Sequence, residues 1–187
     1  VDVSVGYIVI LAFVAGFSLA WAIGANDVAN TFGTSVGAEV LTLKQAIICA
    51  GIFEFLGAFL MGSQVADTLR DGILIPEQYE DDPAQLAVGM TASMMGAWFL
   101  IFLATAFKLP VSATHSVIGA VMGFAIIAQG MDGVIWEEIG FIILSWVTSP
   151  LIAGTLAFVM FTSIRRFILR AENSFERGLY FLPLCYW

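Results

Sequence analysis

Residues 24–37 place side chains of the kind that bind ions within an otherwise apolar sequence. The stretch combines one carboxylate, two amides and several hydroxyl groups, carried by Asn26, Asp27, Asn30, Thr31, Thr34 and Ser35. Carboxylate and amide oxygens are hard ligands that suit sodium or a proton relay, and the glycines on both sides permit the unwound backbone at which such sites form. The alternative is a helix cap, because Asn and Asp before a helix satisfy its free backbone amides. The stretch predicts a cation site, a cap, or one group that serves as both.

Glu54 is the second residue whose position indicates chemistry. It lies ten positions after Lys44, which is roughly 15 Å along a helix and close to the midplane if that helix crosses a bilayer. Its neighbours three and four residues away are all small, namely Ala50, Gly51, Gly57 and Ala58. A face of small residues approaches another helix closely, so we expect Glu54 to point into protein and to be functional. The alternative is a protonated or hydrogen-bonded glutamate that only joins helices.

The third element is the segment 108–116, where Pro110 ends one helix and a cluster of hydroxyl groups opens the next. A helix N-terminus with free N–H groups and nearby hydroxyls favours an anion, because the helix dipole and the unpaired donors both point at it. Ser112 and Thr114 are the expected donors. The alternative is an ordinary loop with an N-cap serine. His115, the one histidine of the sequence, is either a proton carrier or a hydrogen-bonded structural residue.

The composition is that of a membrane protein, since 60% of the 187 residues are hydrophobic and only 12% are charged. The formal net charge of -8 comes from 15 acidic residues against 7 lysines and arginines. This balance argues against a nucleic-acid partner, which would need clustered basic side chains. The sequence has no phosphate-binding P-loop, no metal-ligand spacing and no Gly-x-Ser-x-Gly elbow. A nucleotide-driven pump is therefore not expected.

Five apolar segments are long enough to cross a bilayer core about 30 Å thick, which takes roughly 20 helical residues. They are residues 4–23, 45–63, 84–107, 111–129 and 139–164. The interval 24–43 contains three glycines and two charges, and we expect it to be a broken or re-entrant helix. The Gly-x-x-x-Gly pairs at 33–37 and 119–123 predict close helix packing. We divide the chain into a transmembrane repeat unit, 1–170, and a polar linker that leads into a further span cut short, 171–187.

Charges at the segment ends indicate how the spans are oriented. Lys44, Lys108 and the arginines within 165–170 fall on one side if each segment crosses once, and most acidic residues fall on the other. The positive-inside rule then places the basic side in the cytoplasm and the N-terminus outside. After an odd number of crossings, a second copy of the same unit would insert upside down. The expected fold is therefore an all-α integral membrane protein, a multi-span helical bundle with broken or re-entrant helices, that forms one half of an inverted repeat.

These motifs, taken in order, resemble the inorganic phosphate transporters of the Pit type, the sodium- or proton-coupled phosphate permeases. The family signature resembles residues 24–30 followed by 32–34, and the family's intramembrane glutamate corresponds to Glu54. The family's Leu-Pro-Val-Ser-x-Thr-His element matches residues 109–115, and the stretch 145–150 is also similar. The matches cover nearly the whole chain, which therefore resembles the N-terminal half of such a transporter.

The resemblance implies a transporter of two halves with inverted topology, which holds phosphate near the midplane between the paired signature motifs. The residues that it implies for phosphate are Asn26, Asp27, Asn30, Ser112 and Thr114. Those implied for cation coupling are Asp27 and Glu54, and a sodium ion would be held by Asp27 and Asn30.

We therefore expect a secondary transporter, a cation-coupled symporter of inorganic phosphate in the plasma membrane, with no enzyme activity and no cofactor besides a sodium ion or proton. Its expected partners are phosphate, the coupling cation, the lipid bilayer and a second inverted half or another copy of the chain, and no nucleic acid. Two alternatives stay open. An intramembrane enzyme would use His115 with Asp27 or Glu54 as acid and base. A passive anion channel would need no carboxylate at the centre of a packed helix face.

Overall fold

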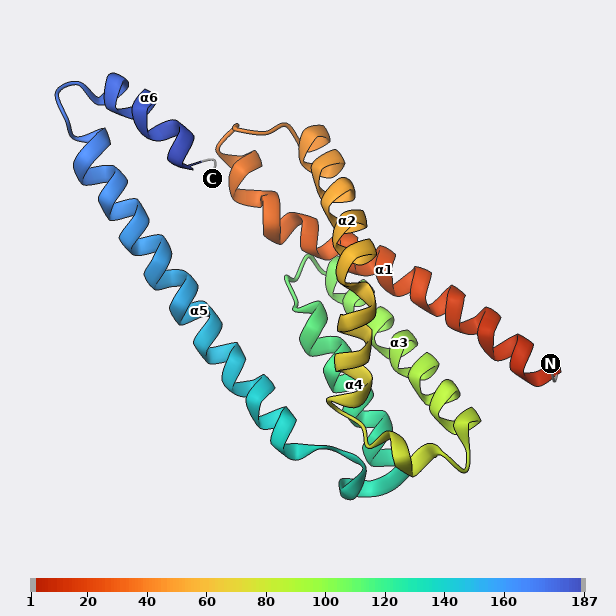
Figure 1. The fold of residues 1–187 in the computed structure, drawn as a ribbon. Coiled ribbons are helices and arrows are strands. Elements are labelled where there is room, and N and C mark those ends of the chain that lie inside the picture. The colour runs from red at the N-terminus through yellow and green to blue at the C-terminus, as the bar shows by residue number, and fades with distance from the viewer. Residues whose placement is uncertain (1–2, 186–187) are drawn as a thin grey trace. The chain divides into compact units, whose positions relative to one another are not determined.

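The computed structural model describes the backbone of residues 3–185 and the side chains in that range except those of residues 3–5, 68, 70, 184 and 185. The described part of the chain is helical (Figure 1). Its α-helices are α1 (Val3–Gly37), α2 (Leu43–Asp71), α3 (Pro83–Ala106), α4 (Ala113–Gln129), α5 (Trp136–Ile164) and α6 (Ser174–Cys185). The shorter elements are the 3-10 turns η1 (Pro76–Tyr79) and η2 (Gly130–Gly133) and the π-helical turn η3 (Arg165–Leu169).

Five helices of the described residues are long and apolar enough to cross a membrane. Their apolar ranges are Gly6–Gly37, Leu43–Asp67, Pro83–Ala106, Ala113–Gly133 and Trp136–Leu169. The predicted fold class, an all-helical chain with five spans in this order, is confirmed. The chain divides into two compact units, Val1–Glu138 and Ile139–Trp187.

The first helix runs further than the sequence predicts. α1 continues without a break past its internal glycines, since a glycine costs a helix only about 1 kcal/mol relative to alanine. The helix stops where Glu39 adopts a left-handed backbone with φ 59°. The N–H of Val40 then donates to the carbonyl of Ser35 at 3.0 Å, which closes the last turn. The interruption expected within 24–43 is therefore a short connection after α1, and the glycines themselves lie in regular helix.

Local side chains fix where the next two helices begin. Thr42 and Gln45 form a capping box at the start of α2, in which the Gln45 N–H donates to Thr42 Oγ1 at 3.3 Å and the Thr42 N–H donates to Gln45 Oε1 at 2.9 Å. Asp82 is the N-cap of α3, and its carboxylate accepts a hydrogen bond from the Gln85 N–H at 3.1 Å. Pro83 follows at the first helical position, where a proline is tolerated. These caps set the ends of α2 and α3 independently of the core.

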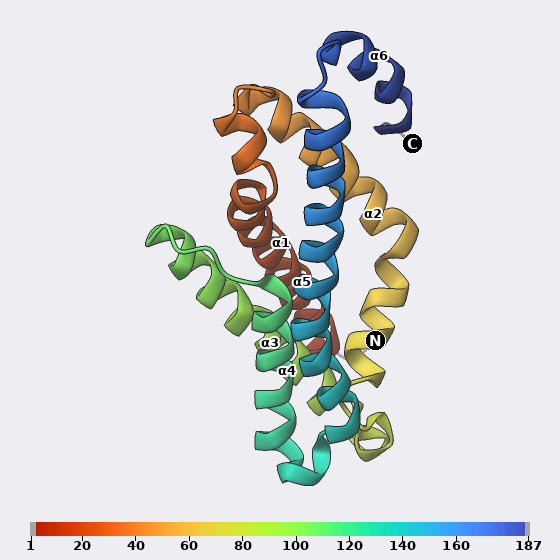
Figure 2. The same cartoon turned by 90° about the vertical axis from the view of Figure 1, so that its left-hand side faces the viewer.

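The core of the first unit lies where α1 packs on α3 and α3 packs on α4, an arrangement that can be followed in Figures 1 and 2. Its buried side chains are Leu19, Ala22, Ala97 and Ile101. Partly buried apolar residues surround them, and Trp98 and Val111 are among these. α2 contacts α1 less extensively than α3 does. The most firmly held part of α1 is therefore the side that faces α3.

The two Gly-x-x-x-Gly pairs do not mark close packing. A Cβ atom added at Gly33, Gly37, Gly119 or Gly123 would meet no described atom within 4 Å. The close approach of α3 and α4 depends instead on Gly89, where an added Cβ would overlap the ring of Phe124. The prediction of close helix packing at the two pairs is therefore wrong for the described residues.

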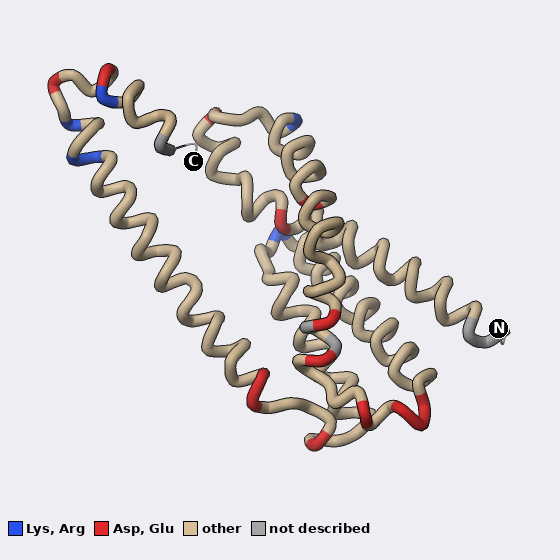
Figure 3. Tube along the Cα trace, in the orientation of Figure 1, with Lys and Arg blue, Asp and Glu red and all other residues tan. Residues whose placement is uncertain are grey.

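The loops that follow α2 and α4 fold together into a small cap on the first unit. A single antiparallel bridge joins them, and the Ile135 N–H donates to the Ile73 carbonyl at 3.1 Å. Tyr79 is only 1% exposed, and its ring lies 5.7 Å from that of Phe124. Figure 3 shows acidic residues in these loops. The acidic end of the first unit is thus an ordered structure with its own buried aromatic residue.

The second unit consists of the rest of α5, η3 and α6. α5 continues through Pro150 as a helix. After η3, the chain turns back, so that Arg177 Nη1 donates to the Phe167 carbonyl at 3.1 Å and Ile168 is buried. The segment 171–187, expected as a linker and the start of a further span, contains α6 over Ser174–Cys185.

Candidate functional site

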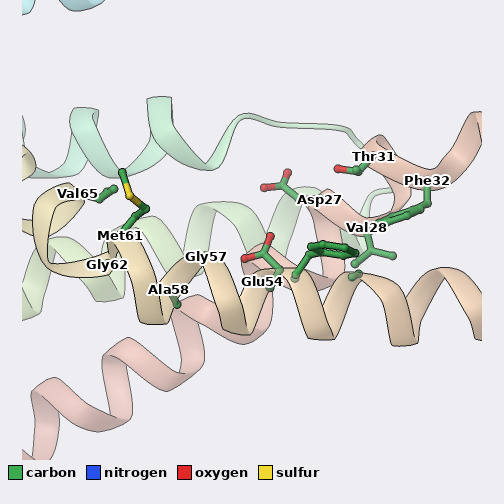
Figure 4. Close-up of a pocket in the computed structure, with 13 residues that line it drawn as sticks. Asp27, Val28, Thr31, Phe32, Glu54, Gly57, Ala58, Met61, Gly62 and Val65 are labelled. Carbon is green, nitrogen blue, oxygen red and sulfur yellow. The ribbon is translucent and has the colours of Figure 1, made fainter. Parts of the chain in front are cut away.

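A groove between α1 and α2 contains two carboxylates (Figure 4), and we call it the carboxylate groove. Its volume is about 570 Å³, and its described lining comes from these two helices. Asp27 on α1 and Glu54 on α2 extend into the groove from its two walls. Thr31 adds a hydroxyl group beside them. Two facing carboxylates repel each other unless a proton or a cation lies between them, so this arrangement attracts positive charge.

Small residues of α2 make room for the groove. Ala50, Gly57, Ala58 and Gly62 line it on either side of Glu54. Residues at these spacings share one face of a helix, so Glu54 lies on a small-residue face that is turned toward α1. The groove is open, and the Glu54 side chain is exposed in the described chain.

Asn26 lies on another side of α1 and connects it to the loop between α3 and α4. Its side chain is 6% exposed. The Nδ2 group donates to Thr105 Oγ1 at 3.0 Å and to the Leu109 carbonyl at 3.1 Å. The Oδ1 oxygen accepts from the Val111 N–H at 3.2 Å and from Asn30 Nδ2 at 3.3 Å. One buried amide thus joins α1, α3 and the segment that leads into α4.

Asn30 lies on α1 between the side that carries Asn26 and the side that carries Asp27. Its Nδ2 group donates to Asn26 Oδ1 at 3.3 Å and makes a longer contact of 3.5 Å with Asp27 Oδ1. Both contacts use the nitrogen, and the Oδ1 oxygen takes no hydrogen bond from the described residues. That oxygen and the Asp27 carboxylate are hard ligands of the kind that sodium takes. Asn30 therefore links the buried amide to the carboxylate groove.

The loop between α3 and α4 has its shape from two backbone features. Lys108 adopts a left-handed backbone with φ 59°, and the Leu109 N–H donates to the Ala104 carbonyl at 2.8 Å, which ends α3. Pro110 then prevents the helix from resuming. Asn26 bonds the residues on both sides of Pro110, so a side chain of α1 helps to hold this short segment.

Ser112 is the N-cap of α4. Its Oγ atom accepts from the His115 N–H at 3.3 Å and lies 2.6 Å from His115 Nδ1. Ser112 and Thr114 are both exposed, whereas Ser116 is buried and donates to the Ser112 carbonyl at 2.9 Å. The structure therefore shows Ser112 as a helix cap. The residue is also exposed at a helix N-terminus, which is where anions bind.

The structure sorts the candidate residues into three places. The carboxylate groove contains Asp27 and Glu54. A second groove of about 360 Å³ is lined by Asn26 and Asn30 together with Thr105 and Lys108. Ser112 and Thr114 lie at the start of α4 and line neither groove.

Two residues near the site were missed by sequence reasoning. Lys108 lines the second groove, whereas its place in the sequence, at the end of an apolar segment, indicates only how the spans are oriented. Thr105 lies in an otherwise apolar run. The one sequence feature that could have drawn attention to it is a hydroxyl group shortly before Pro110. Its partner Asn26 lies 79 residues away, so no local pattern indicates the bond between them.

The apolar spans and the helical fold define a multi-pass integral membrane protein. Residues 23–187 match the phosphate transporter family, and the chain belongs to that family. The predicted resemblance of the chain to the phosphate transporters is thereby confirmed.

Known relatives and a solved structure agree with the assignment. The chain is 44% identical over 170 residues to a sodium-dependent phosphate transporter of Plasmodium falciparum, covering 91% of this chain and 25% of that one. It is 43% identical over 180 residues to sodium-dependent phosphate transporter 1 of Mus musculus, covering 96% and 26%. A solved structure titled the sodium-dependent phosphate transporter matches with a TM-score of 0.85 and 43% identity, covering 90% of this chain and 42% of that chain. The chain thus spans less than half the length of these relatives.

Proposed function

We propose that this chain forms one half of a transporter that moves inorganic phosphate across the plasma membrane together with sodium ions. The observation that carries the proposal is the pair of carboxylates, Asp27 and Glu54, that face each other in one groove between two spans. The relatives are more than twice as long as the chain, which leaves room for a second half. We propose that this half is an inverted copy of the same unit, because an odd number of spans would insert a second copy upside down.

Sodium is the coupling ion that the relatives favour, since two of them are named sodium-dependent. The chemistry of the groove supports the same choice. Asp27 and Glu54 supply carboxylate oxygens to this groove. Asn30, whose amide nitrogen contacts Asp27, carries an amide oxygen that could add a further ligand. These are hard ligands that suit a small cation without d-electron preferences.

The cation also solves an electrostatic problem. Like charges repel one another more strongly in a low-dielectric site between membrane spans than in water. A phosphate dianion near the ionised pair would meet this repulsion from both carboxylates. Cations bound by Asp27 and Glu54 neutralise the groove, so phosphate binds only when the coupling ion is present. This order of binding is what couples the two fluxes.

Phosphate itself would be held by hydroxyl donors at the start of α4. We assign this role to Ser112 and Thr114, because both are exposed at the N-terminus of α4, where the helix dipole and the first N–H groups favour an anion. Asn30 completes this set from α1. The two halves would then rock about the site and expose it to either side of the membrane.

The alternatives fit the molecule less well. An enzyme that pairs His115 with Asp27 or Glu54 has no support from the relatives, which are named as transporters, and His115 does not line the carboxylate groove. A passive channel would have no use for two carboxylates that face each other between packed spans.

The direct test is uptake of radiolabelled phosphate by the full-length protein in liposomes under imposed gradients. An inward sodium gradient should accumulate phosphate above its equilibrium level, and an equal potassium gradient should not. Accumulation driven by a proton gradient without sodium would identify the proton as the coupling ion. Uptake that only equilibrates under every gradient would refute the symporter and indicate a channel.

A further inference from the structure

We infer that Asn26 and Thr105 form a clasp that sets the rotation of α1 and so aims Asp27 at Glu54. In this account, Asn26 is a positioning residue and does not bind phosphate or sodium itself. The inference rests on the proposed function for its transport readout, and it adds Thr105, a residue outside both the family motifs and the carboxylate groove.

The hydrogen bonds of Asn26 leave it no free capacity. A carboxamide has two N–H donors and two acceptor lone pairs. In Asn26, the donors are used by Thr105 and Leu109, and the oxygen accepts from Val111 and Asn30. The side chain is also 6% exposed. A ligand would have to replace one of these bonds, so the structure assigns Asn26 to the scaffold.

The clasp acts on Asp27 through the geometry of the helix. Successive residues of an α-helix are rotated by about 100° about its axis. Holding Asn26 against the loop between α3 and α4 therefore turns Asp27 away from that loop. Asp27 accordingly lines the carboxylate groove with Glu54, and Asn26 lines the second groove with Leu109. Since α2 contacts α1 less extensively than α3 does, the clasp and the α1–α3 core are what hold this rotation.

The same clasp also places the start of α4. Asn26 bonds the Val111 N–H, and Ser112 is the next residue and the N-cap of α4. One amide therefore sets the distance between the proposed cation ligand on α1 and the proposed phosphate donors on α4. Loosening it should disturb the coupling between the two ligands more than the fold of either helix.

Thr105 allows the clasp to be opened without touching the site. Its Oγ1 atom accepts from Asn26 and donates to the Ile101 carbonyl at 2.8 Å. Thr91 is a matched control on the same helix, because its Oγ1 atom makes the same local bond, to the Ala87 carbonyl at 2.8 Å. Both side chains are partly buried, so Thr→Val removes one hydroxyl group at similar volume in each case.

The experiment compares Thr105→Val, Thr105→Ser and Thr91→Val in the full-length protein in liposomes. The readout is the sodium concentration that gives half-maximal phosphate uptake, which does not depend on the amount of folded protein. Loss of one hydrogen bond should raise it by about fivefold in Thr105→Val. Thr105→Ser keeps the hydroxyl group and should behave like the wild type, as should Thr91→Val. Equal sodium dependence in Thr105→Val and Thr91→Val would overturn the inference.

A second measurement works whether or not sodium drives uptake. Spin labels at Asp27→Cys and Glu54→Cys, with the native cysteines replaced by serine, report the distance across the carboxylate groove. Adding Thr105→Val should broaden or shift that distance distribution, and adding Thr91→Val should leave it unchanged. An unchanged distribution with Thr105→Val would show that the clasp does not orient Asp27. A wild-type protein without sodium-dependent uptake would refute the proposed function, and the spin labels would still test the clasp.

Discussion

Asp27 on α1 faces Glu54 on α2 across a groove of about 570 Å³, while its neighbour Asn26 is fixed to the α3–α4 loop. Adjacent residues of one helix thus serve different purposes. Asn26 is saturated with protein hydrogen bonds and buried, whereas Asp27 is only partly buried and lines the open groove. This division explains why a polar cluster occurs in a helix that is otherwise mostly apolar.

The space beside Glu54 should be needed for transport. Gly57 lines the carboxylate groove, and Gly51, on the same helix, does not. Neither glycine has a described atom within 4 Å of an added Cβ, so a side chain can begin at both positions without a clash at the Cβ. Gly57→Leu should reduce phosphate uptake at least about tenfold, because the leucine fills the groove, and Gly51→Leu should leave uptake unchanged. The two variants are matched in helix stability, since each gains up to about 1 kcal/mol in helix propensity. Equal uptake by the two variants, measured per molecule of purified protein, would argue against the groove as the site.

A substitution at Ser112 can distinguish its role as a helix cap from its proposed role in binding phosphate. Aspartate is as good an N-cap as serine and also favours the helix dipole, so Ser112→Asp should keep the stability of α4. Its negative charge should nevertheless raise the phosphate concentration for half-maximal uptake by about tenfold, because a like charge about 4 Å away costs between about 1 and 4 kcal/mol as the surroundings change from water to a protein surface.

Asp82 supplies the control for this exchange. It is the N-cap of α3, with its carboxylate 3.1 Å from the Gln85 N–H, in the loop that precedes that helix. Asp82→Ser should leave the half-saturating phosphate concentration unchanged. Wild-type phosphate dependence in Ser112→Asp would remove Ser112 from the proposed phosphate site.

The buried hydroxyl group of Tyr79 should lower the stability of the fold. The Tyr79 side chain is 1% exposed, and its hydroxyl group is the buried polar side-chain atom of the described residues that has no hydrogen-bond partner. Tyr79→Phe removes this unsatisfied group and should raise the free energy of unfolding by about 1 kcal/mol. A thermal unfolding midpoint of Tyr79→Phe below that of the wild type would contradict the burial of an unsatisfied hydroxyl group in the loops after α2 and α4.

The pH dependence of the Tyr79 variant follows from its burial. Burial raises the pKa of the Tyr79 hydroxyl above its ordinary value of 10.0. The folded state therefore stays neutral at a pH where the unfolded chain already ionises, so stability is lost as the pH rises above about 10. Tyr79→Phe lacks this loss. Its advantage over the wild type in unfolding midpoint should increase above that pH, and a constant difference would show that Tyr79 is not buried in solution.

Sequence patterns predicted the spans, and they singled out Asp27 and Glu54 as candidate site residues, because both predictions depend on local properties of the chain. A run of apolar residues identifies each span, and the small residues at helical spacing placed Glu54 on a face that turns toward α1. The end of α1 was not predictable in this way. It depends on Glu39 in a left-handed conformation, which is uncommon for a residue other than glycine.

The clasp could not be predicted because it depends on tertiary packing. Asn26 and Thr105 meet only when α1 lies on α3, and Leu109 and Val111 become partners only because Lys108 and Pro110 extend the loop. From the sequence alone, Asn26 has the same chemistry as Asn30. The structure distinguishes them, because one amide is saturated and buried and the other is exposed next to Asp27.

Sodium-driven uptake of radiolabelled phosphate by the full-length protein in liposomes tests the central claim most directly. The comparison is between the wild type, Asp27→Asn, Glu54→Gln and the loop control Glu80→Gln. Each groove variant should lose sodium-dependent uptake by at least about tenfold, equivalent to about 1.4 kcal/mol, and Glu80→Gln should match the wild type. Wild-type sodium-dependent uptake in both Asp27→Asn and Glu54→Gln would contradict the claim that these two carboxylates couple phosphate to sodium.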